Sequence, residues 1–420
     1  MTSQESNLRY QNAIKPPAYY LFILLVAILL DEILDNYFLG VFNDRPMPQK
    51  ALFYGAFLFL QIIAAPLQAG FSDFYCRKKS LIVALSCSAI SLVFVFFYFN
   101  NFFPQLVVLS IAASLKATLG NTLPLSWAGI ADTKNQDYRF SLGLSTSIIA
   151  AGYLVLIIID TIFSEQKALI VIFLLFTCLI PMVCKKFFDL IDRKSQRDQV
   201  ATELGLDNHP SQNSTKYFFK LLFLDSKSLW KNFLKCARFR MGLLGVFLPL
   251  ETSFYSTHAL GVDLALAGFE IVTVLMIIGY LFGIVVLKYC KNQADEALIK
   301  VGYKISITSF LPMFVLIPVL SSDHLRWVIT ACYCVYSFGI AFIVPSLFSA
   351  LSKDREPHEQ GKIYGLIDST DTVSLLIALI AGFIYSYLKN PIFIISFSFI
   401  IFLTSRCFYA KFSKTKKKDR

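Results

Sequence analysis

A few ionisable residues lie inside long apolar stretches of this 420-residue chain. An ionised side chain in the middle of a membrane helix costs about 2.5–3.5 kcal/mol on insertion scales, so such residues are candidates for function. A carboxylate there can take up and release a proton, hold a sodium ion or bind a cationic molecule, and a lysine can pair with it or bind an anion. The candidates are Asp31, Glu32, Asp35, Lys116, Glu251 and Asp371.

Several of these candidates share a depth, roughly 16–22 Å from the end at which their apolar stretch begins, at 1.5 Å per residue. They are Asp31, Glu32, Lys116 and Glu251. We expect at least one of the three acids to titrate and Lys116 to pair with it. A purely structural ion pair, a sodium site and a site for a charged substrate remain open alternatives.

The composition predicts that membrane helices carry these residues. Hydrophobic residues make up 56% of the chain and charged residues 16%, and the mean hydropathy is +0.61. A helix of about 20 apolar residues crosses the hydrocarbon core and satisfies its backbone hydrogen bonds internally. Twelve stretches approach this length: 17–40, 50–70, 80–99, 105–130, 141–163, 168–187, 241–260, 265–287, 304–321, 326–350, 363–387 and 391–411.

The net charge of +11 is explained by topology. With the N-terminus placed inside, 33 of the 39 lysines and arginines fall in cytoplasmic segments and 5 in outer loops, which follows the positive-inside rule. We therefore expect a multi-pass protein of the bacterial inner (plasma) membrane with both termini in the cytoplasm. Its basic residues are expected to contact membrane lipids, and no nucleic acid partner is expected.

The longest polar stretch divides the twelve predicted helices into six and six. Lysines from Lys216 to Lys235 gather on one side of a helical wheel, which predicts a basic amphipathic helix on the inner leaflet. The expected organisation is a cytoplasmic segment over 1–16, a first half over 17–187, a linker over 188–240, a second half over 241–411 and a basic tail over 412–420.

The two halves repeat each other. Pro124 corresponds to Pro345 at an offset of 221 residues, and Gly143 corresponds to Gly365 at an offset of 222. Each pair lies on equivalent predicted helices. Repeated halves of this kind place a substrate site near mid-membrane, between the halves.

The loop after the second predicted helix carries the most specific motif. It resembles the signature Gly-x-x-x-Asp-Arg-x-Gly-Arg-Lys of the major facilitator superfamily, with Asp73, Arg77 and Lys78 matched. The Lys116-x-x-x-Gly120 spacing is similar to the Arg-x-x-x-Gly motif of the same family.

The fifth predicted helix carries part of a further family motif. Gly143 and Gly152 resemble the first half of the glycine motif associated with antiporters, but Leu156 and Ile157 stand where that motif has Gly-Pro. The resemblance covers essentially the whole chain. It implies an all-α integral membrane fold of 12 transmembrane helices in two pseudo-symmetric six-helix halves, with the first, fourth, seventh and tenth helices lining a central cavity.

The resemblance also implies a function. We expect a secondary active transporter that moves a small molecule by alternating access and is driven by protons. A drug or multidrug efflux antiporter and a non-transporting sensor on the same fold are the alternatives.

Three groups of residues receive expected roles. Asp73 can cap a neighbouring helix or pair with a base across the halves, so Asp73, Arg77 and Lys78 are expected to form a gating loop. Tyr333 and Tyr336 can face the cavity and bind substrate, or simply pack. The candidate hinge residues are Gly120, Pro124, Gly143, Gly152, Pro345 and Gly365.

Catalytic and metal-binding patterns are missing from the sequence. The four histidines are scattered, and the nine cysteines form no Cys-x-x-Cys pair. We therefore expect no enzymatic activity, no cofactor and no metal site, and a protein that works as a monomer.

Overall fold

A computed structural model describes residues 18–41, 47–74, 76–100, 105–133, 138–187, 269–316, 322–353, 359–388 and 391–418. These residues form helices and short connections and contain no β-strand. The predicted terminal segment 1–16, the linker 188–240 with its amphipathic helix, and the seventh predicted helix with Glu251 lie outside the described residues.

The helices fall into two groups along the chain. The first group is α2 (Ala18–Val41), α3 (Met47–Phe74), α4 (Arg77–Phe99), α5 (Gln105–Leu119), α6 (Leu123–Asp132), α7 (Tyr138–Ile162) and α8 (Glu165–Lys186). The second group is α13 (Phe269–Tyr289), α14 (Asp295–Leu316), α15 (Ser322–Ser352), α16 (Gln360–Leu388) and α17 (Pro391–Lys418).

Two predicted helices differ from the structure in an informative way. The fourth is not continuous, because α5 ends at Leu119 and α6 begins at Leu123. The twelfth extends to Lys418, so the lysines of the predicted tail up to Lys418 lie in its last turns.

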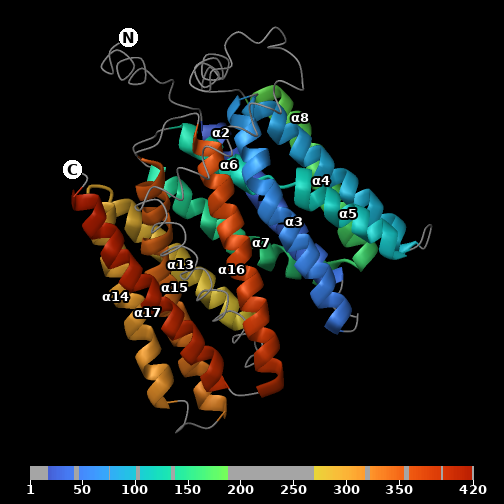
Figure 1. The fold of residues 1–420 in the computed structure, drawn as a ribbon. Coiled ribbons are helices and arrows are strands. Elements are labelled where there is room, and N and C mark those ends of the chain that lie inside the picture. The colour runs from blue at the N-terminus through green and yellow to red at the C-terminus, as the bar shows by residue number, and fades with distance from the viewer. Residues whose placement is uncertain are drawn as a thin grey trace, which may run out of the picture.

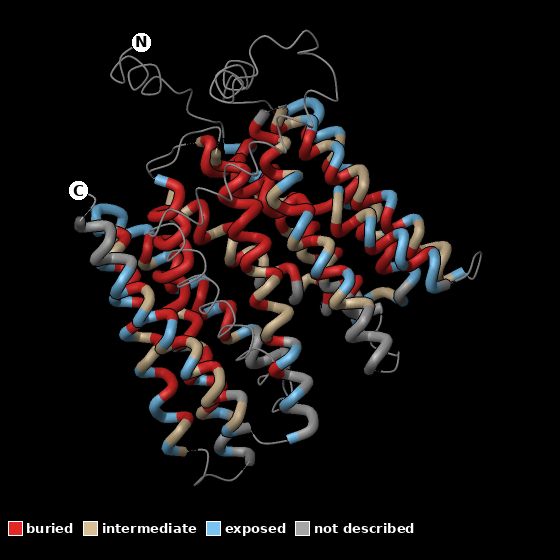
Figure 2. Tube along the Cα trace, in the orientation of Figure 1, coloured by how far each residue is buried: buried red, intermediate tan, exposed pale blue. Residues whose placement is uncertain are grey.

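The outer faces of the helices are suited to lipid. Six described segments are long and apolar enough to cross a membrane. Large apolar side chains point outward on them, including Leu106 at 72% exposure and Val315 at 66%. Buried residues instead concentrate where the helices converge (Figure 2). This distribution is typical of a helix bundle surrounded by hydrocarbon.

The two groups of helices meet at one end of the bundle and diverge towards the other (Figure 1). We call the end at which α3 ends and α4, α7 and α16 begin the closed end. There α16 of the second group packs against α3 and α6, and α7 of the first group packs against α13 and α15.

These two crossings are related by the internal repeat. A Cβ atom added to Gly365 of α16 would lie 2.6 Å from the Cα of Pro66 on α3, and one added to Gly143 of α7 would lie 2.5 Å from Cδ1 of Ile284 on α13. Glycine is needed at Gly365 because the backbone of α3 approaches it, whereas at Gly143 the close neighbour is the end of the Ile284 side chain. The paired positions differ by 222 residues for the glycines and 218 for their partners.

Candidate functional site

The candidate site is a buried cluster of two aspartates and a lysine. Lys116 of α5 places its Nζ 2.8 Å from Asp31 Oδ1 and 2.8 Å from Asp35 Oδ1. The two aspartates are one turn apart on α2, so they share a helix face. With all three groups ionised the cluster carries one negative charge, and one proton makes it neutral. We call these residues the aspartate–lysine cluster.

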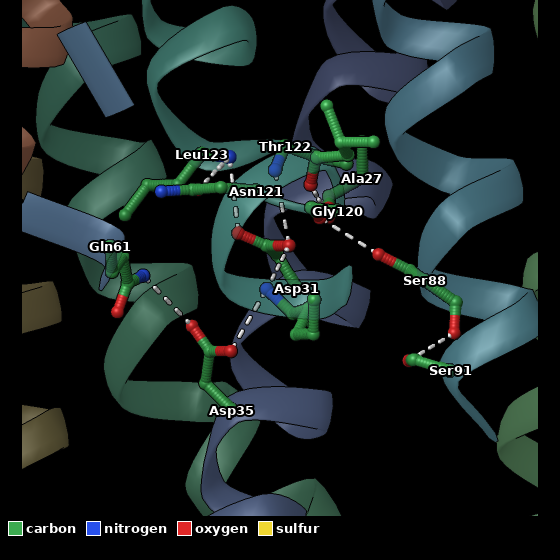
Figure 3. Close-up of polar contacts among 12 residues, drawn as sticks. Ala27, Asp31, Asp35, Gln61, Ser88, Ser91, Gly120, Asn121, Thr122 and Leu123 are labelled. Carbon is green, nitrogen blue, oxygen red and sulfur yellow. Dashed lines mark hydrogen bonds and ion pairs between the residues drawn. The ribbon is translucent and has the colours of Figure 1, made fainter. Parts of the chain in front are cut away.

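The two aspartates differ in exposure. The side chain of Asp31 is 3% exposed and that of Asp35 is 21% exposed. Asp35 also accepts a long hydrogen bond of 3.5 Å from Gln61 of α3 (Figure 3). Water therefore reaches the cluster most readily through Asp35.

The break between α5 and α6 explains how Asp31 is held. Its Oδ1 accepts the backbone N–H of Thr122 at 3.1 Å, and its Oδ2 accepts that of Leu123 at 3.1 Å (Figure 3). The start of a helix carries partial positive charge and its end partial negative charge. Asp31 lies at the start of α6 and Lys116 in the last turn of α5, so both charges suit the helix ends that they face.

Side chains also satisfy the carbonyl groups that the break leaves without helical partners. Gln68 of α3 donates to the carbonyl of Leu119 at 2.6 Å, and Ser88 of α4 donates to that of Gly120 at 2.8 Å. An added Cβ on Gly120 would lie 2.9 Å from the Ser88 hydroxyl, so this position favours glycine. Pro124 follows in the first turn of α6, where its missing N–H is harmless.

The break reaches the second group of helices. Asn121, between Gly120 and Thr122, donates its Nδ2 to Asp368 Oδ2 of α16 at 2.7 Å. Asn121 and Asp368 are 0% and 2% exposed. The sequence marks Asp368 and Asp371 as the two intramembrane acids of this helix, with Asp371 as the predicted site residue, and it assigns no role to Asn121. The sequence signal for Asn121 is its place directly after Gly120, as an amide inside an apolar stretch.

The other predicted site residues make separate contacts. Glu32 turns towards α7, where its Cγ would be 2.8 Å from a Cβ placed on Gly152. Asp371 is half-buried, one turn after Asp368. Tyr336 packs its ring against Phe310 and Phe402.

Tyr333 is fully buried on the same helix, α15. Glu251 lies outside the described residues. Their roles in binding stay predictions.

A buried ionic network lies at the closed end. Arg77 pairs with Asp73 at 3.0 Å and with Asp132, at the end of α6, at 3.1 Å. The Asp73 carboxylate also accepts the backbone N–H groups of Gly361 and Lys362, at 2.9 and 3.0 Å, at the start of α16. We call Asp73, Arg77 and Asp132 the first latch, because Asp73 ties one half to the other.

Lys78, the third predicted gating residue, is half-buried beside Arg77. Gly361 suits its place, because an added Cβ would lie 2.7 Å from both carboxylate oxygens of Asp73. The gating role itself stays a prediction.

A second network repeats the first with the charges reversed. Asp295, in the first turn of α14, lies 2.7 Å from Lys353 at the end of α15 and 2.5 Å from Arg139 at the start of α7. Arg139 also donates to the carbonyl of Gln293 at 3.1 Å. We call Asp295, Lys353 and Arg139 the second latch. In the second latch, Arg139 of the first half makes the contact between the halves by pairing with Asp295 of the second half.

The latches occupy equivalent positions. Arg77 and Asp295 are 218 residues apart, and Asp132 and Lys353 are 221 apart. These offsets match the repeat seen in the sequence. The sign of the charge is reversed in each pair, because Asp295 stands in the place of Arg77 and Lys353 in the place of Asp132.

Aromatic residues add further contacts between the two halves. Trp127 of α6 packs edge-on against Phe348 of α15, with ring centroids 5.1 Å apart. The hydroxyl of Tyr138 hydrogen-bonds those of Ser352 and Tyr364. These residues come from both halves, so they add apolar burial and hydrogen bonds to the closed end.

The predicted hinge residues lie at three kinds of place. One is that of Gly152 of α7, which packs against the side chain of Glu32 on α2. Gly120 and Pro124 flank the break in the fourth helix. Gly143, Gly365 and Pro345 lie where the halves approach, since Pro345 Cγ is 3.3 Å from a Cβ placed on Gly143. Whether they act as hinges stays a prediction.

Comparison with known proteins adds the family context. A family model described as Major Facilitator Superfamily matches residues 21–379. The tetracycline resistance protein, class H, of Pasteurella multocida is 23% identical over 385 residues, which cover 86% of this chain and 89% of that protein.

Solved structures agree in fold. A bacterial homologue of the iron transporter ferroportin, in an outward-facing state, superposes with a TM-score of 0.68 at 15% identity, over 94% of this chain and 99% of that one. The E. coli fucose:proton symporter gives a TM-score of 0.63 at 14% identity, over 94% and 98%. At these identities the likeness concerns the fold alone.

Proposed function

Because the chain belongs to the Major Facilitator Superfamily, we propose that it is a secondary active transporter that moves a small molecule by alternating access, driven by protons. The observation that carries proton coupling is the aspartate–lysine cluster. One lysine shared by two buried aspartates leaves a single negative charge that one proton neutralises.

The proton path follows from exposure. Asp35 takes up the proton first because it is the more exposed carboxylate. Neutralising Asp35 then changes the ion pair of Asp31, because the two acids share Lys116. A protonated Asp35 needs no counter-ion, so Lys116 is left to Asp31 alone. The charge balance at the broken helix thereby depends on proton uptake.

The two latches supply the alternation. In the state described, both hold the closed end together, and the helices diverge towards the other end (Figure 1). We assign the closed end to the cytoplasm, which makes this an outward-facing state. The excess of lysine and arginine in the segments assigned to that side supports the assignment. Opening the closed end requires Asp73 and Arg139 to release their partners in the other half.

The substrate is proposed to bind between the halves, near the cluster. Glu32, Asp371, Tyr333, Tyr336 and Glu251 are candidate contacts. Coupling to sodium instead of protons is the alternative for the ion. The protein is proposed to work as a monomer in the inner membrane, surrounded by lipid.

Drug efflux by antiport is the second candidate function. The likeness to a tetracycline resistance protein supports it. The absence of Gly-Pro at Leu156 and Ile157 argues against it. A non-transporting sensor is the third candidate, since a fold can serve several functions.

The test is flux in proteoliposomes under an imposed pH gradient. Tetracycline is the first labelled probe, followed by sugars and organic anions. Accumulation should follow the gradient in wild-type protein and be lost in Asp31→Asn and Asp35→Asn, while exchange at equal pH persists. Flux that ignores the gradient for every transported probe would contradict proton coupling. No flux of any probe would favour the sensor.

A further inference from the structure

The Asn121–Asp368 contact joins the cluster to the opposite half. The backbone N–H of Leu123 is shared by Asp31 Oδ2 at 3.1 Å and by Asn121 Oδ1 at 3.2 Å. The side-chain oxygen of Asn121 and the carboxylate of Asp31 therefore accept hydrogen bonds from the same N–H group. The side-chain nitrogen of Asn121 is then aimed at Asp368 Oδ2, 2.7 Å away on α16.

The strength with which Asp31 holds the start of α6 thus affects the position of Asn121. An ionised carboxylate accepts stronger hydrogen bonds than a neutral one, so ionised Asp31 fixes Thr122 and Leu123 at the start of α6. When Asp35 is protonated, Lys116 pairs with Asp31 alone, and its Nζ competes more strongly with the Thr122 N–H for Asp31 Oδ1. This weakens the hold of Asp31 on the turn from Gly120 to Thr122 and lets the turn relax. Asn121 then loses the orientation that reaches Asp368.

Losing this contact disfavours the closed state. Asp368 is 2% exposed, and a buried carboxylate deprived of its donor is costly. Separation of the halves would restore water to it. On this basis we propose that Asn121 and Asp368 are positioning residues that couple protonation of the aspartate–lysine cluster to opening of the closed end. The proposal rests on the proton coupling proposed above.

Other charged groups surround the turn. Among the described elements, α2 contributes Asp31, Glu32 and Asp35, α5 contributes Lys116, and α16 contributes Asp368 and Asp371. The neighbouring helices α3 and α4 present the neutral Gln61, Gln68 and Ser88. Asn121 is the side chain that bridges from the turn to α16 in the contacts described.

The experiment uses two native cysteines as reporters. Cys76 precedes α4 and Cys290 follows α13, so they lie at the closed end in different halves. The other seven of the nine cysteines are replaced by serine or alanine. Spin labels on the two remaining sites report their separation by pulsed electron resonance in lipid nanodiscs, without any substrate. The pH is varied from about 8 to about 5, a range in which perturbed buried carboxylates titrate.

Two variants break the contact and two controls keep it. Asn121→Ala removes the donor and Asp368→Ala the acceptor, so in both the closed fraction should no longer follow pH. Asp368→Asn keeps an acceptor and should stay responsive. Ser369→Ala is the matched control, because Ser369 donates across the halves to the carbonyl of Ile62 at 2.7 Å and, among the described residues, makes no hydrogen bond to the turn. It should stay responsive too.

The magnitude comes from the hydrogen bond that is lost. In wild type the closed-to-open ratio should change about tenfold over this pH range, as expected for one hydrogen bond to a charged group. If Asn121→Ala does not fold, Asp368→Ala tests the same contact from the other side.

The possible outcomes separate the two proposals. A wild-type distance that ignores pH would overturn proton coupling and this inference together. A responsive wild type with equally responsive Asn121→Ala and Asp368→Ala would overturn the inference alone. Loss of response in Ser369→Ala as well would also overturn it, because any contact between the halves would then suffice.

Discussion

Replacing Lys116 with glutamine isolates the charge balance of the cluster. The substitution leaves Asp31 and Asp35 facing each other with no cation, in a site where Lys116 is fully buried. Removing one partner of a buried ion pair destabilises a protein by about 3–5 kcal/mol. We expect a loss of this size in Lys116→Gln at pH values where both acids are ionised. The loss should shrink at acidic pH, because protonated carboxyls need no counter-ion.

The structure identifies which acid should rescue this variant. Asp31 keeps the N–H groups of Thr122 and Leu123 when Lys116 is gone, whereas Asp35 keeps only the long contact from Gln61. Adding Asp35→Asn to Lys116→Gln also restores the original single negative charge. The double variant should recover about 1–3 kcal/mol relative to additive losses, a normal coupling energy for residues in one network.

The assay is reversible unfolding of the purified protein in mixed detergent micelles, followed by circular dichroism. Lys353→Gln is the matched control, because Lys353 also pairs with an aspartate but its side chain is 52% exposed. Its loss should stay below about 1 kcal/mol. An undiminished free energy of unfolding in Lys116→Gln, or a further loss on adding Asp35→Asn, would refute the assignment of Lys116 as the shared counter-ion.

Three further predictions concern the closed end. Asp73→Asn should slow transport more than it lowers the free energy of unfolding, because the start of α16 loses its charged acceptor; equal losses measured on one preparation would indicate a structural role. Arg139→Gln and Asp295→Asn should each widen the distance between the labelled cysteines, and the double variant should widen it no further; additive widening would show that the two residues act separately. Gly365→Val should hold the closed end apart, because its Cβ would lie 2.6 Å from the Pro66 backbone. Gly55→Val is the control, with open space around its Cβ, and the idea fails if both variants give the wild-type distance.

The sequence was sufficient for the fold and for part of the site. Long apolar stretches and repeated landmarks predicted two helical halves, because hydropathy and spacing depend only on local composition. Lys116 and Asp31 were found because buried charges are conspicuous. The second partner of Lys116 is Asp35, one turn further along α2, whereas Glu32 lies about 100° around the helix and faces α7.

Two features needed the structure. The sequence predicts a continuous fourth helix across the break after Leu119, since glycine and proline such as Gly120 and Pro124 are tolerated within membrane helices. Its stability depends on donors from α3 and α4 that no local pattern reveals. The second latch was missed because the equivalent helix end of the second half, residues 283–292, has no acid in the place of Asp73. Asp295 supplies the acid from the next helix, and the repeat keeps the positions while reversing the charges.

The distance in sequence between the charges of the cluster affects how the protein is made. Asp31, Glu32 and Asp35 all lie in α2, so this helix emerges from the ribosome with three acids, which cost about 8–10 kcal/mol together on insertion scales. Their counter-ion arrives 85 residues after Asp31, with α5. Until then the contacts that the structure describes from α3 and α4 to the cluster and the helix break come from neutral side chains such as Gln61 and Ser88. The first helix is therefore expected to stay beside the insertion machinery until the fourth is synthesised, and a nascent chain halted before Lys116 should remain extractable from the membrane.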